Sequence, residues 1–239
     1  MRLYYDLHLH SCLSPCGDND MTPNNLVRLA KLFGYDIIAL TDHNSCLNCE
    51  SAVRVGKEAG ITVVPGMELC TSEEIHCICL FPDTEKAMLF SDFVKSKMPP
   101  VKNREHIFGQ QLIMDSEDNV MGQEDILLTT AADISIEYLP ELIKEYEGIC
   151  YPAHIDRSSY SIISALGAFG THLNVSCFEL TPDADEKYYL EKYEGTKNKT
   201  IIRSSDAHYL ENMREPEFTV DLPENSARAL INYLKGDIK

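Results

Sequence analysis

Short apolar runs along the chain alternate with segments whose apolar residues recur at helical spacing. The runs are rich in β-branched and aromatic residues, which is typical of buried strands. They cover residues 3–10, 35–40, 61–64, 148–153, 174–180 and 199–204. Helices are predicted over residues 23–33, 47–59, 84–98, 135–146, 160–168, 184–193 and 226–235. This alternation of strands and helices predicts an α/β fold with a parallel sheet or barrel.

Local signals refine this pattern at two places. Thr22 is typical of the N-cap of the first helix, and Gly34 is typical of its end. Thr84 is expected to cap the helix over residues 84–98 in the same way. Only seven residues separate Glu68 from His76, which is too few for a helical crossover. We therefore expect the run that begins at His76 to return antiparallel to the strand that ends at Glu68.

Residues 97–133 interrupt the alternation. Pro99 and Pro100 break the chain, and the segment after them has no clear period. Within it, residues 111–114 and 119–122 predict either a hairpin or part of a small helical cap. We expect one domain over residues 1–239, in which this segment is an insertion over the functional rim that contributes to specificity.

Residues that can bind metals follow several of the predicted strands. His8 and His10 lie two positions apart, so on a strand their imidazoles project from the same face. Because functional residues of α/β barrels gather at the carboxyl ends of the strands, we expect the later ones at the same rim. They are His43, Glu68, His76, His154, Asp206 and His208. Imidazole and carboxylate donors without thiolate favour Zn, Mn or Fe.

In their order and form, these motifs resemble the PHP family, named for its polymerase and histidinol phosphatase members. The resemblance covers residues 6–208 and implies a distorted seven-stranded (β/α) TIM-like barrel. It also implies metal-dependent phosphoesterase activity. The matching motifs are Asp6-Leu7-His8-Leu9-His10-Ser11, Thr41-Asp42-His43, Pro65-Gly66-Met67-Glu68, His76, His154 and Ser205-Asp206-Ala207-His208.

The resemblance further implies a site for two to three divalent metal ions. An acidic residue four positions before the N-cap often ligates a metal in the family, which indicates Asp18 here, with Asp20 as the alternative. The implied ligands are His8, His10, Asp18, His43, Glu68, His76, His154, Asp206 and His208. The first ion would be held by His8, His10, Glu68 and Asp206. Glu68 would bridge to a second ion with His76 and His154, and Asp18, His43 and His208 would hold the third.

Residues beside the ligands have expected supporting roles. Asp6 and Asp42 either orient ligand imidazoles or make local hydrogen bonds at turns and strand ends. Arg157, three residues after His154, either binds a substrate phosphate with its planar guanidinium or forms a surface ion pair. An Arg at this place is a recurrent phosphate contact in small-molecule phosphoesterases of the family, so the resemblance favours the first role.

Clustered ions suit phosphoester hydrolysis because they lower the pKa of a bound water and offset charge on the phosphoryl oxygens. The predicted catalytic residues are therefore the ligands Glu68, Asp206 and His208, together with Arg157. A small phosphorylated metabolite, most simply a nucleotide mono- or diester, is the expected substrate. The alternatives are a histidinol phosphate phosphatase and a non-catalytic metal-binding or interaction module.

Composition limits the partners. The formal charge of −17 disfavours sustained contact with a long nucleic acid, which requires several Lys or Arg residues. A basic cluster at Lys95, Lys97, Lys102 and Arg104 either faces the substrate or is a solvated surface. No apolar run approaches the ~20 residues that span a membrane, and no signal pattern opens the chain, so we expect a cytoplasmic protein.

Nine cysteines are present, and without a secretory signal they do not predict a disulfide framework. Those near the first two motifs lead to two interpretations. They either bind zinc or an iron–sulfur cluster together, or they are small buried hydrophobic residues. The residues concerned are Cys12, Cys16, Cys46 and Cys49.

Overall fold

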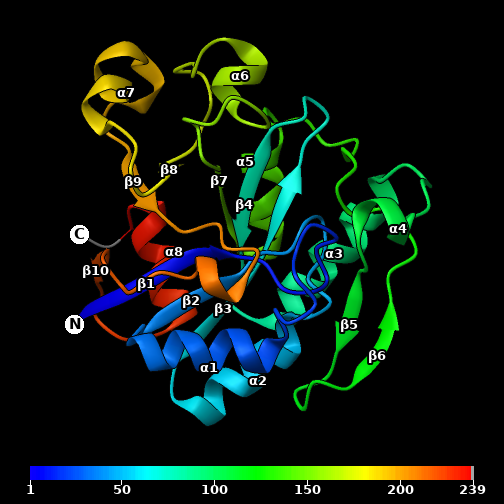
Figure 1. Cartoon of the computed structure of the whole chain (residues 1–239). Coiled ribbons are helices and arrows are strands. Elements are labelled where there is room, and N and C mark those ends of the chain that lie inside the picture. Colours follow the sequence, from blue (N-terminus) through cyan, green and yellow to red (C-terminus); the bar gives the residue numbers. More distant parts are fainter. Residues whose placement is uncertain (238–239) are drawn as a thin grey trace.

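Strand β1 (Arg2–Leu9) lies within a curled six-stranded sheet (Figure 1). The computed structural model describes residues 1–237. In spatial order the strands are β10 (Thr219–Asp221), β1, β2 (Ile37–Leu40), β3 (Thr62–Cys70), β4 (His76–Leu80) and β7 (Ile149–Pro152). Strands β1, β2 and β3 run parallel, whereas β4 is antiparallel to both β3 and β7. The expected return of the chain at His76 is therefore confirmed.

A parallel pair, β8 (Cys177–Leu180) and β9 (Thr200–Arg203), occupies the gap between β7 and β1. Single backbone hydrogen bonds join it to its neighbours. Ile155 N donates to Glu179 O at 3.0 Å on the β7 side, and His10 N donates to Ala207 O at 3.1 Å on the β1 side. The seven strands β1–β4 and β7–β9 thus form a curled α/β half-barrel, which agrees with the distorted seven-stranded TIM-like barrel that the resemblance implies.

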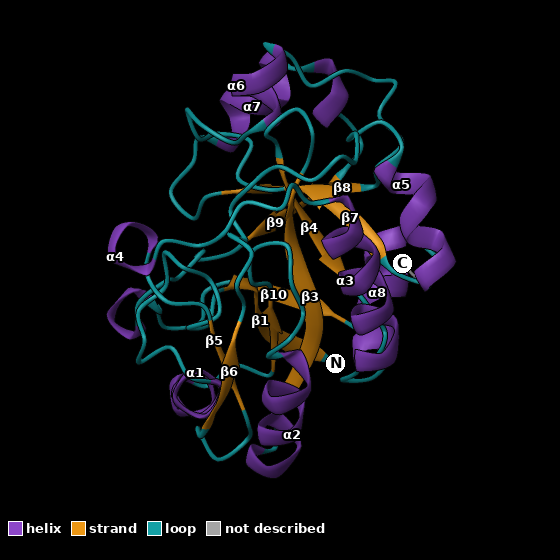
Figure 2. Ribbon diagram, turned by 90° about the vertical axis from the view of Figure 1, so that its right-hand side faces the viewer, coloured by secondary structure: helices purple, strands orange, loops and turns teal. Residues whose placement is uncertain are grey.

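Helices lie around the outside of this sheet (Figure 2). The larger ones are α1 (Pro23–Phe33), α2 (Cys49–Ala59) and α3 (Thr84–Lys97), whereas α8 (Ala227–Lys235) packs against the opposite, interior face of the sheet. Thr22 caps α1 by accepting from Asn25 N, and Gly34 ends it with a left-handed φ of 98°, as predicted. The cap of α3 is a correction: Asp83, not Thr84, accepts from Lys86 N at 2.9 Å.

The predicted helix over residues 135–146 begins later and is less regular than expected. The segment forms only α5 (Leu139–Leu142) and a 3-10 helix, η1 (Ile143–Tyr146). Pro140 has no backbone N–H to donate, so it can lie only in the first turn, and the helix begins there. The two predicted helices that follow are shorter than expected, at α6 (Ile162–Leu166) and α7 (Glu186–Lys192), and the short 3-10 helices η2 (Glu194–Thr196) and η3 (Leu210–Asn212) complete the chain.

Alternate side chains of the strands enter two different hydrophobic clusters. In β2, Ile37 and Ala39 face the interior of the half-barrel, in one cluster with side chains of α8. Ile38 and Leu40 face the outer helices. With both faces buried, the strands keep a fixed register, and the ends of the strands are held in place. Within residues 1–237, no helix is both long and apolar enough to cross a membrane.

The insertion contains α4 (Glu105–Phe108) and a hairpin of β5 (Leu112–Met114) and β6 (Val120–Gln123). Of the two structures predicted for this segment, the hairpin is the one present. Leu112 N donates to Cys12 O at 2.9 Å, and Asn48 bonds the backbone of both Leu112 and Met114. The insertion therefore packs against the loop that follows β1 and the start of α2.

Candidate metal centre

Five imidazoles surround the carboxylate of Glu68, which lies in β3 and is buried. Oε1 lies 2.8 Å from His76 Nδ1, 3.1 Å from His154 Nε2 and 3.2 Å from His8 Nε2. Oε2 lies 2.9 Å from His43 Nδ1 and 3.4 Å from His10 Nε2. These side chains come from β1, β4 and the segments that follow β1, β2 and β7, so the rim of the half-barrel brings them together as predicted.

A second buried carboxylate, Asp206, follows β9. Its Oδ1 lies 3.2 Å from His8 Nε2, 3.1 Å from His10 Nε2 and 3.5 Å from His208 Nδ1. Both Asp206 and His154 have positive φ, 53° and 26°, a region that non-glycine residues rarely adopt. Backbone strain of this kind is tolerated where the surroundings fix a functional side chain.

The donor atoms are arranged for a shared ligand rather than for one another. Asp206 Oδ1 and His43 Nδ1 are buried and close to several polar atoms, yet neither has a partner with hydrogen-bond geometry. Unpaired buried polar atoms are rare in proteins, and metal ions are one of the groups that satisfy them. Three sets of side chains have donor atoms within 4.8 Å of one another: His10, His43 and His208; His8, His10 and Glu68; and His43, Glu68 and His76. The donor set fits more than one divalent metal ion.

Electrostatics at the rim favour ionised carboxylates. Burial opposes the charge of Glu68, but His76, His8 and His43 outweigh it and hold its pKa well below the usual value. Burial likewise opposes the charge of Asp206, and His8 and His10 lower its pKa. For His76 burial dominates and lowers the pKa to about 4. The centre thus holds two buried negative charges, which protonated imidazoles or bound cations can balance.

Asp42 orients a ligand through an intermediate serine. Ser14 Oγ donates to Asp42 Oδ1 at 2.7 Å and lies 2.9 Å from His10 Nδ1, while Ser11 Oγ donates to Asp42 Oδ2 at 2.6 Å. With its Nδ1 engaged, His10 presents Nε2 to the two carboxylates. The orienting role predicted for Asp42 is therefore supported by an indirect contact, through Ser14.

Asp6 plays the local role that the sequence left as its alternative. It accepts the backbone N–H groups of His8 at 3.2 Å and of Ser205 at 3.2 Å. Burial raises its pKa to about 6. Asp6 therefore fastens β1 to the segment that carries Asp206, and its hydrogen bonds go to backbone rather than to an imidazole.

Sequence reasoning missed Glu179, a buried residue of β8. Its Oε1 lies 2.9 Å from His8 Nδ1 and accepts from His154 N at 3.1 Å. This carboxylate fixes the ring of His8 and the backbone of a second ligand. A signal for it was present, because a Glu in the middle of the apolar run 177–180 requires a buried polar partner.

Comparison with known proteins agrees with this geometry. The model of the PHP domain matches residues 6–234. The chain belongs to the PHP family. This family comprises metal-dependent phosphoesterases and nucleases.

Two relatives resemble part of this PHP protein. The uncharacterized protein MJ1587 of Methanocaldococcus jannaschii is 34% identical over 92 residues, which are 35% of this chain and 54% of that protein. A 5'-3' exoribonuclease of Haemophilus influenzae is 37% identical over 79 residues, which are 32% of this chain and 28% of the nuclease. The matched stretches thus span about half and about a quarter of these relatives.

Solved structures share the fold over most of the chain. The lesion-specific endonuclease EndoQ of Pyrococcus furiosus has a TM-score of 0.67 at 17% identity, covering 99% of this chain and 56% of its own. A Bifidobacterium adolescentis protein assigned as a metal-dependent phosphoesterase has a TM-score of 0.60 at 15% identity, and the match covers 85% of this chain and 87% of that protein. An amidohydrolase of Chromobacterium violaceum has a TM-score of 0.61 at 17% identity, and the match covers 99% of this chain and 97% of the amidohydrolase. Since these proteins differ in activity, the likeness establishes the fold and leaves the substrate open.

Of the nine ligands predicted for this PHP domain, the structure brings eight together. Asp18 is the exception. Among the described residues, its carboxylate accepts a hydrogen bond from Asp20 N, at 2.8 Å, within its own turn. Asp20, the alternative, is exposed. Cys16, in the same loop, is exposed, and its thiol belongs to none of the three donor groups. Burial opposes its ionisation, but the nearby His208 and His43 lower its pKa to about 5.

Two further side chains line the open side of the PHP centre. Arg157 Nη1 lies 2.6 Å from Asp206 Oδ2, and the Arg157 side chain is 44% exposed. Tyr160 stacks on the ring of His76, with ring centroids 4.6 Å apart, and the Tyr160 residue is exposed. Arg157 therefore lies beside Asp206 at the open side of the centre.

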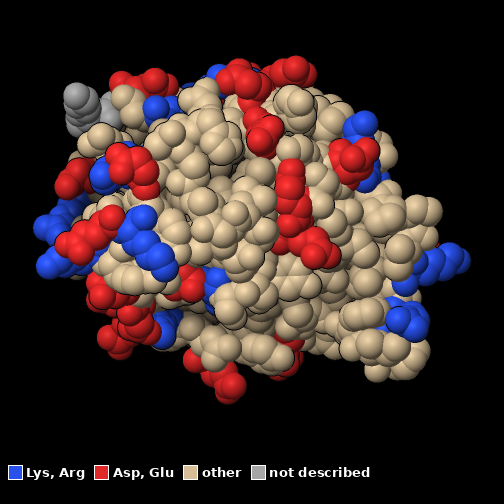
Figure 3. All heavy atoms as spheres, turned by 90° about the horizontal axis from the view of Figure 1, so that it is seen from above, with Lys and Arg blue, Asp and Glu red and all other residues tan. Residues whose placement is uncertain are grey.

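The basic cluster of residues 95–104 makes contacts of its own. Lys95 Nζ pairs with Glu124 Oε2 at 2.7 Å, and Arg104 lies over the ring of Phe108. These contacts favour the interpretation of the cluster as a solvated surface. Figure 3 shows basic and acidic side chains interspersed around the face seen from above, without a continuous basic stripe.

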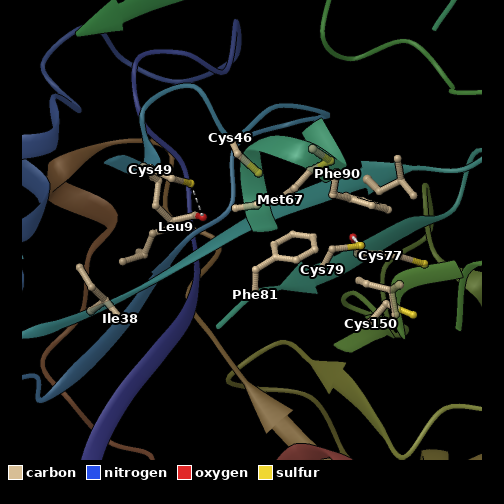
Figure 4. Close-up of a cluster of buried hydrophobic side chains, with 14 of the residues drawn as sticks. Leu9, Ile38, Cys46, Cys49, Met67, Cys77, Cys79, Phe81, Phe90 and Cys150 are labelled. Carbon is tan, nitrogen blue, oxygen red and sulfur yellow. Dashed lines mark hydrogen bonds between the residues drawn. The ribbon is translucent and has the colours of Figure 1, made fainter. Parts of the chain in front are cut away.

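The cysteines do not support a four-thiolate site. Cys46 and Cys49 lie in the hydrophobic cluster around Met67 and Phe90 (Figure 4). Both thiols approach Gly66 O. Cys12 lies in a separate small cluster of apolar side chains. Eight of the nine cysteines are buried, and Cys16 is exposed. The buried ones act as small hydrophobic residues, the alternative that the sequence left open.

Proposed function

We propose that this PHP protein is a phosphoesterase that hydrolyses a small phosphorylated metabolite, most simply a nucleotide mono- or diester, with two to three divalent ions. The observation that carries the proposal is the pair of buried carboxylates, Glu68 and Asp206, enclosed by six imidazoles. When bound, such ions acidify a coordinated water and offset charge on phosphoryl oxygens. Zn, Mn and Fe all accept these donors.

The contacts support the following division of the ligands among the ions. His8, His10, Glu68 and Asp206 would hold the first. Glu68 would bridge to the second with His76 and His154, whose ring nitrogens share Oε1. His43 and His208 would contribute to the third, beside His10.

Residues outside this set have supporting tasks in the proposed reaction. Glu179 and the Asp42–Ser14 pair fix the rings of His8 and His10, which keeps the donor atoms aimed at common points. Arg157 would bind a non-bridging phosphoryl oxygen and leave its present contact with Asp206.

A competing function is cleavage of a long polynucleotide, which the printed activities of two similar proteins suggest. The charge of −17 and the interspersed surface charges favour the smaller substrate. The test measures metal content by elemental analysis and phosphate release on the same sample. Its panel contains nucleoside phosphates, small diesters, histidinol phosphate and DNA and RNA oligonucleotides.

We expect two to three metals per chain and the highest kcat/KM on a small phosphate ester. Preference for histidinol phosphate or for long oligonucleotides would replace the proposed substrate class. Bound metal without hydrolysis of any substrate in the panel would favour the non-catalytic module instead.

Replacing Arg157 with Ala is expected to lower kcat/KM by about 10- to 100-fold, because a charge-assisted hydrogen bond to phosphate contributes roughly 1.5–3 kcal/mol. Arg157→Lys should recover only part of this loss, since a single ammonium lacks the guanidinium fork. The matched control is Arg214→Ala, which removes an exposed Arg–Asp pair, with Asp183, outside the centre. Equal kcat/KM for the Arg157 and Arg214 variants would exclude the phosphate contact.

A further inference from the structure

One short loop carries two exposed side chains beside the metal centre. It runs from β7 to α6, directly after the ligand His154, and it holds Arg157 and Tyr160 three residues apart. The Arg157 side chain is 44% exposed and contacts Asp206 Oδ2 at 2.6 Å. Tyr160 is 47% exposed, and its ring stacks on that of His76 with an angle of 21° between the ring planes. A cation and an aromatic ring thus lie on one loop, each in contact with a predicted metal ligand.

The backbone of this loop is fixed at Tyr160 and next to it. His76 N donates to Tyr160 O at 2.8 Å, which ties the loop to β4. The next residue, Ser161, is buried, caps α6 and donates from Oγ to Arg157 O at 2.7 Å. Tyr160 itself has a φ of 53°, in the left-handed region that non-glycine residues rarely adopt. The loop therefore presents its two side chains in a defined arrangement, which a binding site requires.

The contact with His76 occupies one face of the Tyr160 ring. Within residues 1–237, no second aromatic ring stacks on Tyr160, and the residue is exposed. Its open surface therefore lies on the opposite face and the edges of the ring. Aromatic groups bind such a face by offset stacking. An exposed aromatic ring on a loop held by a rigid scaffold is typical of a residue that binds a ligand.

We propose that Tyr160 is the residue on which the base of a nucleotide substrate stacks, while Arg157 and the metal centre hold its phosphate. This inference rests on the proposed function and assigns the part of the substrate that the metal centre does not recognise. A nucleotide carries a planar aromatic base a short distance from its phosphate, which matches a guanidinium and an aromatic ring on one loop. Because every base has a π face, stacking tolerates all of them, and we expect weak discrimination among bases.

The test compares AMP with ribose 5-phosphate, which has the same sugar and phosphate but no base. In the metal-replete full chain, Tyr160→Leu is expected to lower kcat/KM for AMP by about 5- to 100-fold, the loss typical of an aromatic platform for one base. The kcat/KM for ribose 5-phosphate should be unchanged, because Leu keeps an apolar side chain against His76 and removes only the aromatic plane. Tyr160→Phe keeps the plane and should retain the kcat/KM for AMP.

Tyr4→Leu is the matched control. Tyr4 is 43% exposed and lies near the start of β1, at the end of the strand away from the ligands His8 and His10. This change should alter kcat/KM for neither compound. Elemental analysis should find the same metal content in the unaltered protein and in all three variants, since each keeps every predicted ligand.

The outcomes separate this inference from the proposed function. Equal losses on AMP and ribose 5-phosphate in Tyr160→Leu would mean that Tyr160 acts through His76, which would overturn the role in base binding. Unchanged kcat/KM for both compounds in this variant would overturn it as well. Either result leaves the phosphoesterase proposal standing.

A second measurement does not depend on turnover. It uses the phosphonate analogues of AMP and ribose 5-phosphate, in which a P–C bond replaces the ester bond that would be hydrolysed. Isothermal titration calorimetry should show that the AMP analogue binds the metal-replete protein about fivefold or more tightly, and that Tyr160→Leu abolishes this difference. Equal affinities of the unaltered protein for the two analogues would contradict the role of Tyr160, even if the protein hydrolysed no phosphate ester and the proposed function had failed.

Discussion

Glu68→Gln is expected to lower kcat/KM by about 10³-fold or more and to reduce the number of bound metals. Glu68 is the carboxylate on which five imidazoles converge, and both of its oxygens are engaged. A neutral amide removes the bridging charge and replaces one oxygen with an N–H donor that faces ligand nitrogens. Bound metal ions stabilise the transition state by several kcal/mol, and each lost 1.4 kcal/mol lowers kcat/KM about tenfold.

The matched control is Glu74→Gln, at an exposed position in the turn between β3 and β4. It makes the same chemical change on the same hairpin and should leave the metal content and kcat/KM unchanged. Metal content should be measured on both variants by elemental analysis, beside circular dichroism to verify folding. A folded Glu68→Gln protein with a full complement of metals and unchanged kcat/KM would refute the bridging role.

Phe90→Ala is expected to lower the free energy of unfolding by about 3–5 kcal/mol, because it leaves a cavity in the outer core. Phe90 of α3 is fully buried, and its ring lies 5.2 Å from Phe81 and 5.1 Å from Tyr146, measured between centroids (Figure 4). These contacts hold α3 against the sheet beside β3 and β4, the strands that carry Glu68 and His76. Thermal unfolding should shift by on the order of 10 °C.

The neighbouring Leu89 provides the control, since its side chain is 51% exposed on the same helix. Leu89→Ala should change the free energy of unfolding by no more than about 0.5 kcal/mol. Urea unfolding of both variants, in the presence of chelator, separates the packing effect from stabilisation by metal. Similar losses for the two variants would mean that Phe90 does not pack as the structure indicates.

Local sequence pattern was sufficient where the interactions are local. The period of two in β1 places His8 and His10 on the same side of the strand, and the short spacing between Glu68 and His76 requires a hairpin. Pro140 shows the limit of such reasoning within a single segment, because one missing N–H overrides an amphipathic pattern. The gathering of eight predicted ligands at one rim followed from strand order alone.

Tertiary structure decided which of the predicted side chains face the centre. Asp18 does not, because Asp18 N donates to His208 O and its carboxylate turns back to accept from Asp20 N. Glu179 lies 171 residues from His8 and meets it only because β8 closes the half-barrel.

The sequence by itself thus determined the family, the order of strands and helices, and the set of residues able to bind metals, because periodicity, caps and turn lengths act over a few residues. The tertiary structure decided the orientation of Asp42 and Ser14 toward His10 and the role of Glu179. Each of these depends on contacts between segments far apart in the chain, which no local pattern encodes.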